Sequence, residues 1–324
     1  MTQIFGVVTM QHVFHVSDRL LSQNTVSGTV PFDRNSNKTI IFRATDALAV
    51  VSYTGRAYLN HIPTDTFIAQ SLLGHPLSDA GGIILLGRLT SWTDIGRSVE
   101  RLRQDLNETF RSLPEEQRIN DFQVSVLGWR HKRSRNRGIT PVIWELKRPL
   151  GELNAEFKIH RYQRWWNWNK AFVLSMIPEV SHSIVDWMRF QIRTHGGKSP
   201  DEIKRILVEG IRRCAEECPS TVGYSCLQVH LTPIGSPQAR IRYFSDVRQP
   251  NVFPEKVYGY SPWIVAPSVV AIAPAVIQSS TENAGLVYGG TGFTCIYEGP
   301  IRTQGSKGFF SHSSQKRPRD PQKR

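Results

Sequence analysis

A threonine stands at the second position of the chain, in the stretch MTQIFGVV. Its side chain is small enough for an aminopeptidase to remove Met1, which would leave the Thr2 hydroxyl beside a free α-amine. Because such an amine has a pKa of about 8 or lower, it can take up a proton near neutral pH. A threonine hydroxyl with its own α-amine is a recognised pair of nucleophile and base. Thr2 is therefore a candidate nucleophile.

A threonine in this role needs further groups near it. A buried lysine would stabilise the negative charge that develops on the hydroxyl and would lower the pKa of the α-amine. An aspartate beside that lysine would keep the lysine charged and oriented. The fold must therefore bring a lysine and an aspartate close to the first strand, which the pattern IFGVV predicts to begin almost directly after Thr2.

The elements that would position these groups follow from the spacing of apolar residues. Strands are predicted within residues 4–17 and at 39–42, 47–55, 122–129, 141–147, 156–162, 171–177, 225–232 and 239–244. Helices are predicted after Thr64, after Thr93, near 183–193 and at 200–217. Because the helices come in pairs between groups of strands, the order favours antiparallel sheets with helices outside over an alternating βα arrangement.

Three later stretches of the sequence form a pattern together with MTQIFGVV. In chain order they are HVSDR, FDRNSNKTIIF and SYTGRAY. Their residue types and spacing resemble those of the β-type proteasome subunits, which are N-terminal-nucleophile hydrolases. In that family the catalytic threonine is followed four residues later by a Gly-Val-Val strand, and here Thr2 is followed by Gly6, Val7 and Val8.

The resemblance assigns roles to residues after the first strand. The family's catalytic aspartate lies sixteen positions after the threonine, which is Asp18 in this chain. Its catalytic lysine closes an Asp-x-Asn-x-x-Lys segment, matched by Asp33, Asn35 and Lys38. A glycine at the next strand end supplies an oxyanion-hole amide and lines the substrate channel in the family, and Gly55 matches it.

The family's remaining polar groups near the threonine are matched less closely. The stretch VSHSIVDW places Ser181 or Ser183 near the family's serine, without the glycines that flank it there. Before Gly223 the family has an aspartate and a serine, whereas CPSTVG offers Thr221 and no aspartate. Ser181, Ser183 and Thr221 are therefore candidates to support the threonine.

The resemblance implies an α+β fold, specifically a four-layer αββα sandwich of antiparallel sheets, over residues 1–302. It implies a threonine-type hydrolase of peptides or small amides that needs no cofactor and no metal, and self-assembly into a ring or stacked homo-oligomer. The chain has neither the roughly 18 consecutive apolar residues of a membrane span nor a signal-peptide pattern, so a cytoplasmic location is expected. One alternative is a related protein that has lost catalysis and acts as a structural or interaction protein.

The chain is strongly basic, with a formal net charge of +13, and such a balance favours anionic partners. Much of the excess lies in a loop near 130–138 and in a tail over 303–324, whose polar composition predicts disorder. In RYQRWWNWNK, Trp165, Trp166 and Trp168 alternate with basic residues. Aromatic and cationic groups together can hold nucleic acid, but burial against a partner subunit is the favoured interpretation. A basic nucleic-acid-binding protein is the second alternative.

Overall fold

The computed structural model describes most of the chain up to residue 244 and short segments beyond it. The described residues are 2–9, 11–26, 28–34, 36–76, 82–85, 93–118, 121–131, 138–149, 151–162, 173–178, 180–195, 199–232, 238–244, 256–257, 263–266, 269–272, 277–278 and 294–297. Most of the basic loop, the three tryptophans of RYQRWWNWNK and the whole tail over 303–324 lie outside the described residues. The interpretations of those segments therefore stay predictions.

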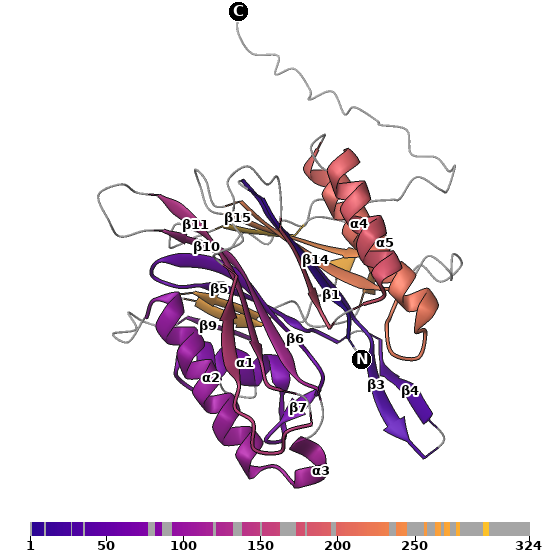
Figure 1. The fold of residues 1–324 in the computed structure, drawn as a ribbon. Coiled ribbons are helices and arrows are strands. Elements are labelled where there is room, and N and C mark those ends of the chain that lie inside the picture. Colours follow the sequence, from indigo (N-terminus) through magenta and orange to yellow (C-terminus); the bar gives the residue numbers. More distant parts are fainter. Residues whose placement is uncertain are drawn as a thin grey trace, which may run out of the picture.

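Two large sheets form the body of the protein (Figure 1). The first has the strand order β13 (Val173–Ile177), β1 (Ile4–Val8), β2 (Val13–Asp18), β14 (Cys226–Thr232), β15 (Gln238–Phe244) and β20 (Thr294–Tyr297). The second has the order β12 (Lys158–Arg161), β11 (Ile139–Lys147), β10 (Gln123–His131), β6 (Ala47–Thr54), β5 (Thr39–Arg43), β17 (Trp263–Ala266), β18 (Val269–Ile272) and β9 (Gly82–Leu85). All their neighbouring strands pair antiparallel except β15 with β20 and β5 with β17. The structure is thus a mixed α/β structure with mainly antiparallel sheets, as predicted.

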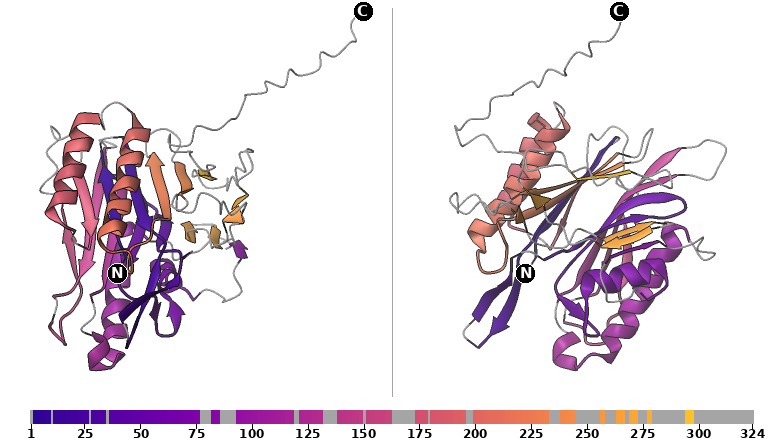
Figure 2. Two further views of the ribbon diagram at one scale, coloured as in Figure 1. Left: turned by 90° about the vertical axis from the view of Figure 1, so that its right-hand side faces the viewer. Right: turned by 180° about the vertical axis from the view of Figure 1, so that it is seen from behind.

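Helices pack against the outer face of each sheet (Figure 2). The helices are α1 (Thr64–Leu73), α2 (Ile95–Ser112), α3 (Glu115–Arg118), α4 (His182–His195) and α5 (Pro200–Glu217). One apolar core joins α4 and α5 to the first sheet, a second joins α1 and α2 to the second sheet, and a third lies between the two sheets. Within the described part of the chain, no helix is long and apolar enough to cross a membrane.

The sequence patterns explain the two longest helices. The Asp94 side chain accepts a hydrogen bond from the Arg97 amide at 3.0 Å and so caps the start of α2. Val99, Leu102 and Leu106 follow at helical spacing and are fully buried against the second sheet. Helix α5 begins in the same way, with Ser199 as its N-cap and a proline in its first turn.

A hairpin of β3 (Leu21–Thr25) and β4 (Gly28–Asp33) was missed by the sequence analysis. It forms a two-stranded sheet of its own that projects from the body near the N-terminus (Figure 1). Its sequence, LSQNTVSGTVPFD, is mostly polar and has no continuous apolar alternation, which is the signal on which strand prediction depends. Shorter elements that were also missed are α3, β9, β7 (Tyr58–Leu59) with β8 (Ile62–Pro63), and β16 (Lys256–Val257) with β19 (Ile277–Gln278).

Polar side chains interrupt the apolar layer between the two sheets. His15 of β2 lies fully buried, and its Nε2 is 2.9 Å from the Ser52 hydroxyl of β6. The hydroxyls of Ser17 in β2 and Thr39 in β5 form a hydrogen bond of 3.2 Å. Because burial disfavours the charged imidazolium, it lowers the pKa of His15 from 6.5 to about 3. His15 is therefore neutral in the folded protein at any ordinary pH.

We predict that His15 makes the protein less stable as the pH falls. Its pKa in the folded state lies below that in the unfolded chain, so the unfolded chain binds the extra proton once the pH drops below about 6.5. Between pH 7 and pH 5 this costs about 2 kcal/mol of unfolding free energy. Denaturant unfolding at the two pH values should show a loss that includes this contribution, together with that of His230, whose pKa burial also lowers to about 3. His15→Asn should reduce the total loss by about 2 kcal/mol.

His182 provides the matched control, because its side chain is exposed at the start of α4. In His182→Asn, the difference in unfolding free energy between pH 7 and pH 5 should be the same as in the wild type. An unchanged pH dependence in His15→Asn would contradict the burial of a neutral His15.

Candidate active site

The centre of the candidate site is an ion pair between Lys38 and Asp18. Lys38 lies just before β5 in the second sheet and Asp18 ends β2 in the first, so the pair connects the two sheets. The Lys38 Nζ lies 3.2 and 3.3 Å from the two carboxylate oxygens of Asp18. Both side chains are 0% exposed. The Nζ also donates to the Leu20 carbonyl. The Lys38 amine is thus bonded to the last residue of β2 and to the turn that follows it.

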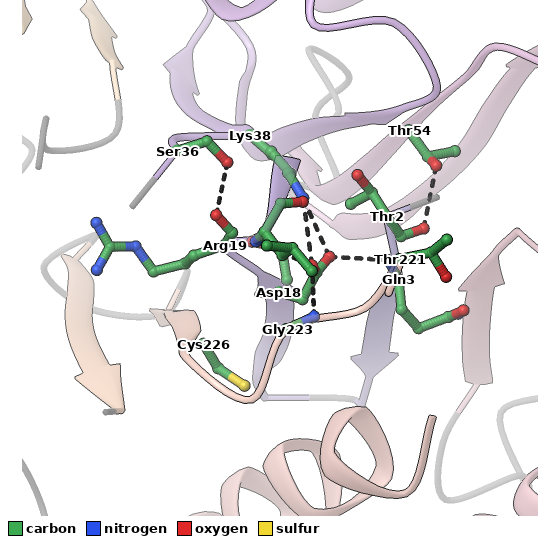
Figure 3. A network of polar contacts seen from close by, with 12 residues as sticks. Thr2, Gln3, Asp18, Arg19, Ser36, Lys38, Thr54, Thr221, Gly223 and Cys226 are labelled. Atoms are coloured by element: carbon green, nitrogen blue, oxygen red, sulfur yellow. Dashed lines mark hydrogen bonds and ion pairs between the residues drawn. The ribbon is translucent and has the colours of Figure 1, made fainter. Parts of the chain in front are cut away.

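The Asp18 carboxylate accepts hydrogen bonds from backbone amides of segments that lie far apart in the chain (Figure 3). Its Oδ1 accepts from the Gln3 amide at 2.9 Å, and its Oδ2 accepts from the amides of Leu20 and Gly223, each at 3.1 Å. Gly223 fits here because a Cβ at this position would lie 2.8 Å from the Cβ of Leu20. A larger residue would push the amide away from the carboxylate.

Burial and the Asp18 carboxylate act on the Lys38 amine in opposite directions. Loss of solvent lowers the pKa of Lys38 below its ordinary value, and this is the largest influence. The negative charge and the hydrogen bonds of Asp18 raise it again. A lysine with a lowered pKa that is still held by a carboxylate can serve as a fixed positive charge in a water-poor site.

Thr2 lies beside this pair, held by its own main chain. It is 5% exposed, and its carbonyl oxygen accepts a hydrogen bond from the Thr54 hydroxyl at 3.0 Å. The next amide, that of Gln3, is the one bonded to Asp18. In Figure 3, Thr2 lies on the same side of Asp18 as Lys38 and Thr54. The structure therefore brings together Thr2, Asp18 and Lys38, the residues that the sequence analysis selected for the chemical steps.

Gly55 follows directly after Thr54 at the end of β6. Its φ of +107° is disfavoured for residues with a side chain, and a Cβ here would lie 2.2 Å from the Asp121 carbonyl oxygen. Glycine is thus required for the chain to turn at this point. Since the preceding residue contacts the carbonyl of Thr2, Gly55 belongs to the strand end that borders the site.

The three candidate supporting residues make their hydrogen bonds elsewhere. The Ser181 hydroxyl is 3.0 Å from that of Ser183 and donates to Glu217 at 3.2 Å. The Thr221 hydroxyl donates to the carbonyl of Cys218 at 3.4 Å. Among the described residues, the hydrogen bonds of these side chains do not reach Thr2, Asp18 or Lys38. Support for Thr2 comes instead from Thr54, which the sequence analysis did not select.

Sequence reasoning also missed two supports of the ion pair. The Gly223 amide bonds Asp18, although Gly223 itself was visible as the glycine before a predicted strand. The hydroxyls of Ser17 and Thr39, each next in sequence to a member of the pair, bond each other across the sheets. Polar residues beside a candidate catalytic residue in two strands are the signal that could have revealed this contact. Within the described residues, no group of three His, Cys, Asp or Glu side chains is arranged to hold a metal ion.

Comparison with solved structures finds distant likenesses. The chain is 12% identical to Anbu (ancestral beta-subunit) from Yersinia bercovieri, with a TM-score of 0.37 over 70% of this chain and 80% of that one. It is 16% identical to BPH of Thiobacillus denitrificans, with a TM-score of 0.38 over 71% of this chain and 97% of that one. Against the same BPH in complex with epoxomicin the identity is 14% and the TM-score 0.39, over 71% and 98% of the two chains.

No family model matches the sequence, and no curated protein matches it.

We predict that the ion pair is essential for stability. In Asp18→Asn the Lys38 ammonium would stay buried without a counter-charge, so the free energy of unfolding should fall by about 3–5 kcal/mol, measured by denaturant unfolding. Asp186→Asn is the control, because Asp186 pairs with Arg189 at 3.7 Å and both side chains are more than half exposed, at 73% and 53%. This change should cost less than about 1 kcal/mol. Equal losses in the two variants would contradict the buried pair.

Proposed function

We propose that the protein is an amide hydrolase of the proteasome-like, N-terminal-nucleophile type, with Thr2 as its nucleophile. The observation that carries the proposal is the placement of Thr2 next to a fully buried Lys38–Asp18 pair. A buried ion pair in an otherwise apolar interior is costly unless every partner is satisfied. Here it is satisfied by amides from the segments that fix Thr2, which is the arrangement that the proposed chemistry needs.

The reaction would run in two halves. The Thr2 hydroxyl attacks the carbonyl carbon of the amide while its α-amine takes up the hydroxyl proton. The C–N bond then breaks, the amine passes the proton to the leaving nitrogen, and an ester forms on Thr2. Water activated by the same amine cleaves the ester and restores the hydroxyl. Lys38 stabilises the negative charge near the Thr2 oxygen, and the Gly55 amide contributes to the oxyanion hole.

The fold that we propose for this function is the four-layer αββα sandwich. Its support is the order of the apolar cores, which lie between α4–α5 and the first sheet, between the sheets, and between the second sheet and α1–α2. The expected peptide or small-amide substrate and the expected self-assembly are parts of the same proposal.

We predict that the reaction requires both groups of Thr2. Thr2→Ala removes the hydroxyl, so release of a fluorescent amine from short peptide amides should fall to the background rate. A short peptide fused before Thr2 converts the α-amine into an amide, which cannot accept the proton, and should have the same effect. Measurement by steady-state fluorescence needs only the purified full chain.

Thr194→Ala controls for the loss of a threonine hydroxyl, because Thr194 is exposed on α4 and donates only to the Phe190 carbonyl of its own helix among the contacts described. This variant should keep full activity. Wild-type activity that survives in Thr2→Ala or in the fusion would refute the proposed mechanism.

A further inference from the structure

Another buried carboxyl, that of Asp65, contacts Asn37, the residue directly before Lys38. Asp65 is in the first turn of α1 and is only 7% exposed. In the described part of the chain it forms no ion pair. Helix capping alone does not explain its position, because only one of its oxygens bonds the helix: Oδ1 accepts from the Thr66 amide at 2.8 Å.

The other oxygen contacts the segment just before β5, which also carries Lys38. Asp65 Oδ2 accepts from the side-chain amide of Asn37 at 3.1 Å. The Asn37 Oδ1 in turn accepts from the backbone amide of Thr39 at 3.2 Å. This pattern fixes the orientation of the Asn37 amide, since its NH₂ must face the carboxylate and its oxygen must face the backbone N–H. Asn37 is therefore locked between the helix and the start of the strand.

The residues locked in this way flank Lys38 on both sides. The Asn37 carbonyl also accepts from the Tyr53 hydroxyl at 3.2 Å, and the Lys38 carbonyl accepts from the Tyr53 amide at 3.3 Å. Helix α1 and strand β6 thus hold the three consecutive residues 37–39. The Lys38 side chain leaves this segment toward Asp18, so the direction in which it points depends on how firmly the segment is held.

We propose that Asp65 is a positioning residue, which holds Lys38 in place for the reaction through its hydrogen bond to Asn37. This inference rests on the proposed function for its catalytic consequence, but the link from Asp65 to Lys38 can be measured without any activity. A displaced amine stabilises charge on Thr2 less well, and small errors of position in a catalytic group lower the rate of the chemical step.

Burial makes the charge of this carboxyl sensitive to pH in an ordinary range. Loss of solvent raises the pKa of Asp65 to about 6, although the hydrogen bonds from Thr66 and Asn37 oppose the shift. The titratable side chain that faces it from the second sheet is Tyr53, whose pKa is raised well above its ordinary value by burial and, to a lesser extent, by the charge of Asp65. As the pH falls through about 6 the carboxylate takes up a proton, and the hydrogen bond from Asn37 loses the strength that a charged acceptor gives.

The test exchanges the hydrogen-bond donor and acceptor between positions 37 and 65. In Asp65→Asn, position 65 keeps only one acceptor oxygen, so it loses either the bond from Asn37 or the bond from the Thr66 amide, and in both cases the negative charge that strengthens the bond from Asn37. We expect kcat on a peptide amide to fall about tenfold with KM within about twofold, and the ε-carbon NMR resonance of Lys38 to move. The double variant Asp65→Asn with Asn37→Asp restores a donor facing an acceptor, so kcat and the resonance should return toward the wild type.

Asp94→Asn is the matched control, because Asp94 also accepts a helix amide, at the start of α2, but does not contact the strand of Lys38. It should change neither readout. If Asp65→Asn fails to fold, a pH titration of the wild type replaces it: the Lys38 resonance should follow the protonation of Asp65 with a midpoint near pH 6.

The outcomes separate this inference from the proposed function. A wild type without hydrolytic activity would refute the function, while the Lys38 resonance would still decide whether Asp65 holds Lys38. An active wild type in which Asp65→Asn leaves both kcat and the Lys38 resonance unchanged would refute the positioning role. Loss of activity in both the single and the double variant would also refute the positioning role, because the restored hydrogen bond would then have no effect on kcat.

Discussion

The buried ion pair of Lys38 and Asp18 is the interaction on which the rest of the site depends. Removing two charges from water costs several kcal/mol for each ion, and the attraction between the two ions alone does not offset this desolvation cost. The structure offsets the cost with further hydrogen bonds: Lys38 donates to the Leu20 carbonyl, and the amides of Gln3, Leu20 and Gly223 donate to Asp18. These donors come from the N-terminus, the turn after β2 and the loop after α5. Satisfying one carboxylate therefore fixes three segments of the chain relative to one another.

The same constraint positions Thr2. Its main chain is held on one side by Asp18, through the Gln3 amide, and on the other by the Thr54 hydroxyl from the second sheet. A residue so near the end of a chain would normally be free to move, since terminal residues are poorly ordered unless they are tied down. Here the ends of strands from two sheets meet around it. The chemistry proposed for Thr2 depends on this order, because the hydroxyl, its own amine and the Lys38 amine must keep fixed distances.

Much of this could be predicted from the sequence, and the limits have physical reasons. The strands around Gly6 and Val50 were predicted because strands buried on both faces are continuous runs of apolar, β-branched residues. The helices at Leu102 and Leu207 were predicted because burial on one face leaves a helical period. Thr2, Asp18 and Lys38 were selected because their types and order resemble those of β-type proteasome subunits, and the structure places the main chain of Thr2 next to the Lys38–Asp18 pair. Their chemical roles stay a prediction. The β3–β4 hairpin was missed, since polar strands without a buried face have no such pattern. The Gly223 amide and Asp65 act through contacts between segments distant in sequence, and the spacing of residues carries no signal for them. Ser181 and Ser183 were suggested by their position in the resemblance to the family, whereas in the structure their hydroxyls bond each other and that of Ser181 donates to Glu217.

The most direct test of the central claim is the mass of the purified full chain before and after incubation with a peptide epoxyketone, followed by mapping of the modified residue. The account predicts a chain that begins at Thr2 and gains one reagent molecule on that residue, with no gain in Thr2→Ala. A chain that keeps Met1, or a reagent bound at any other residue, would contradict it.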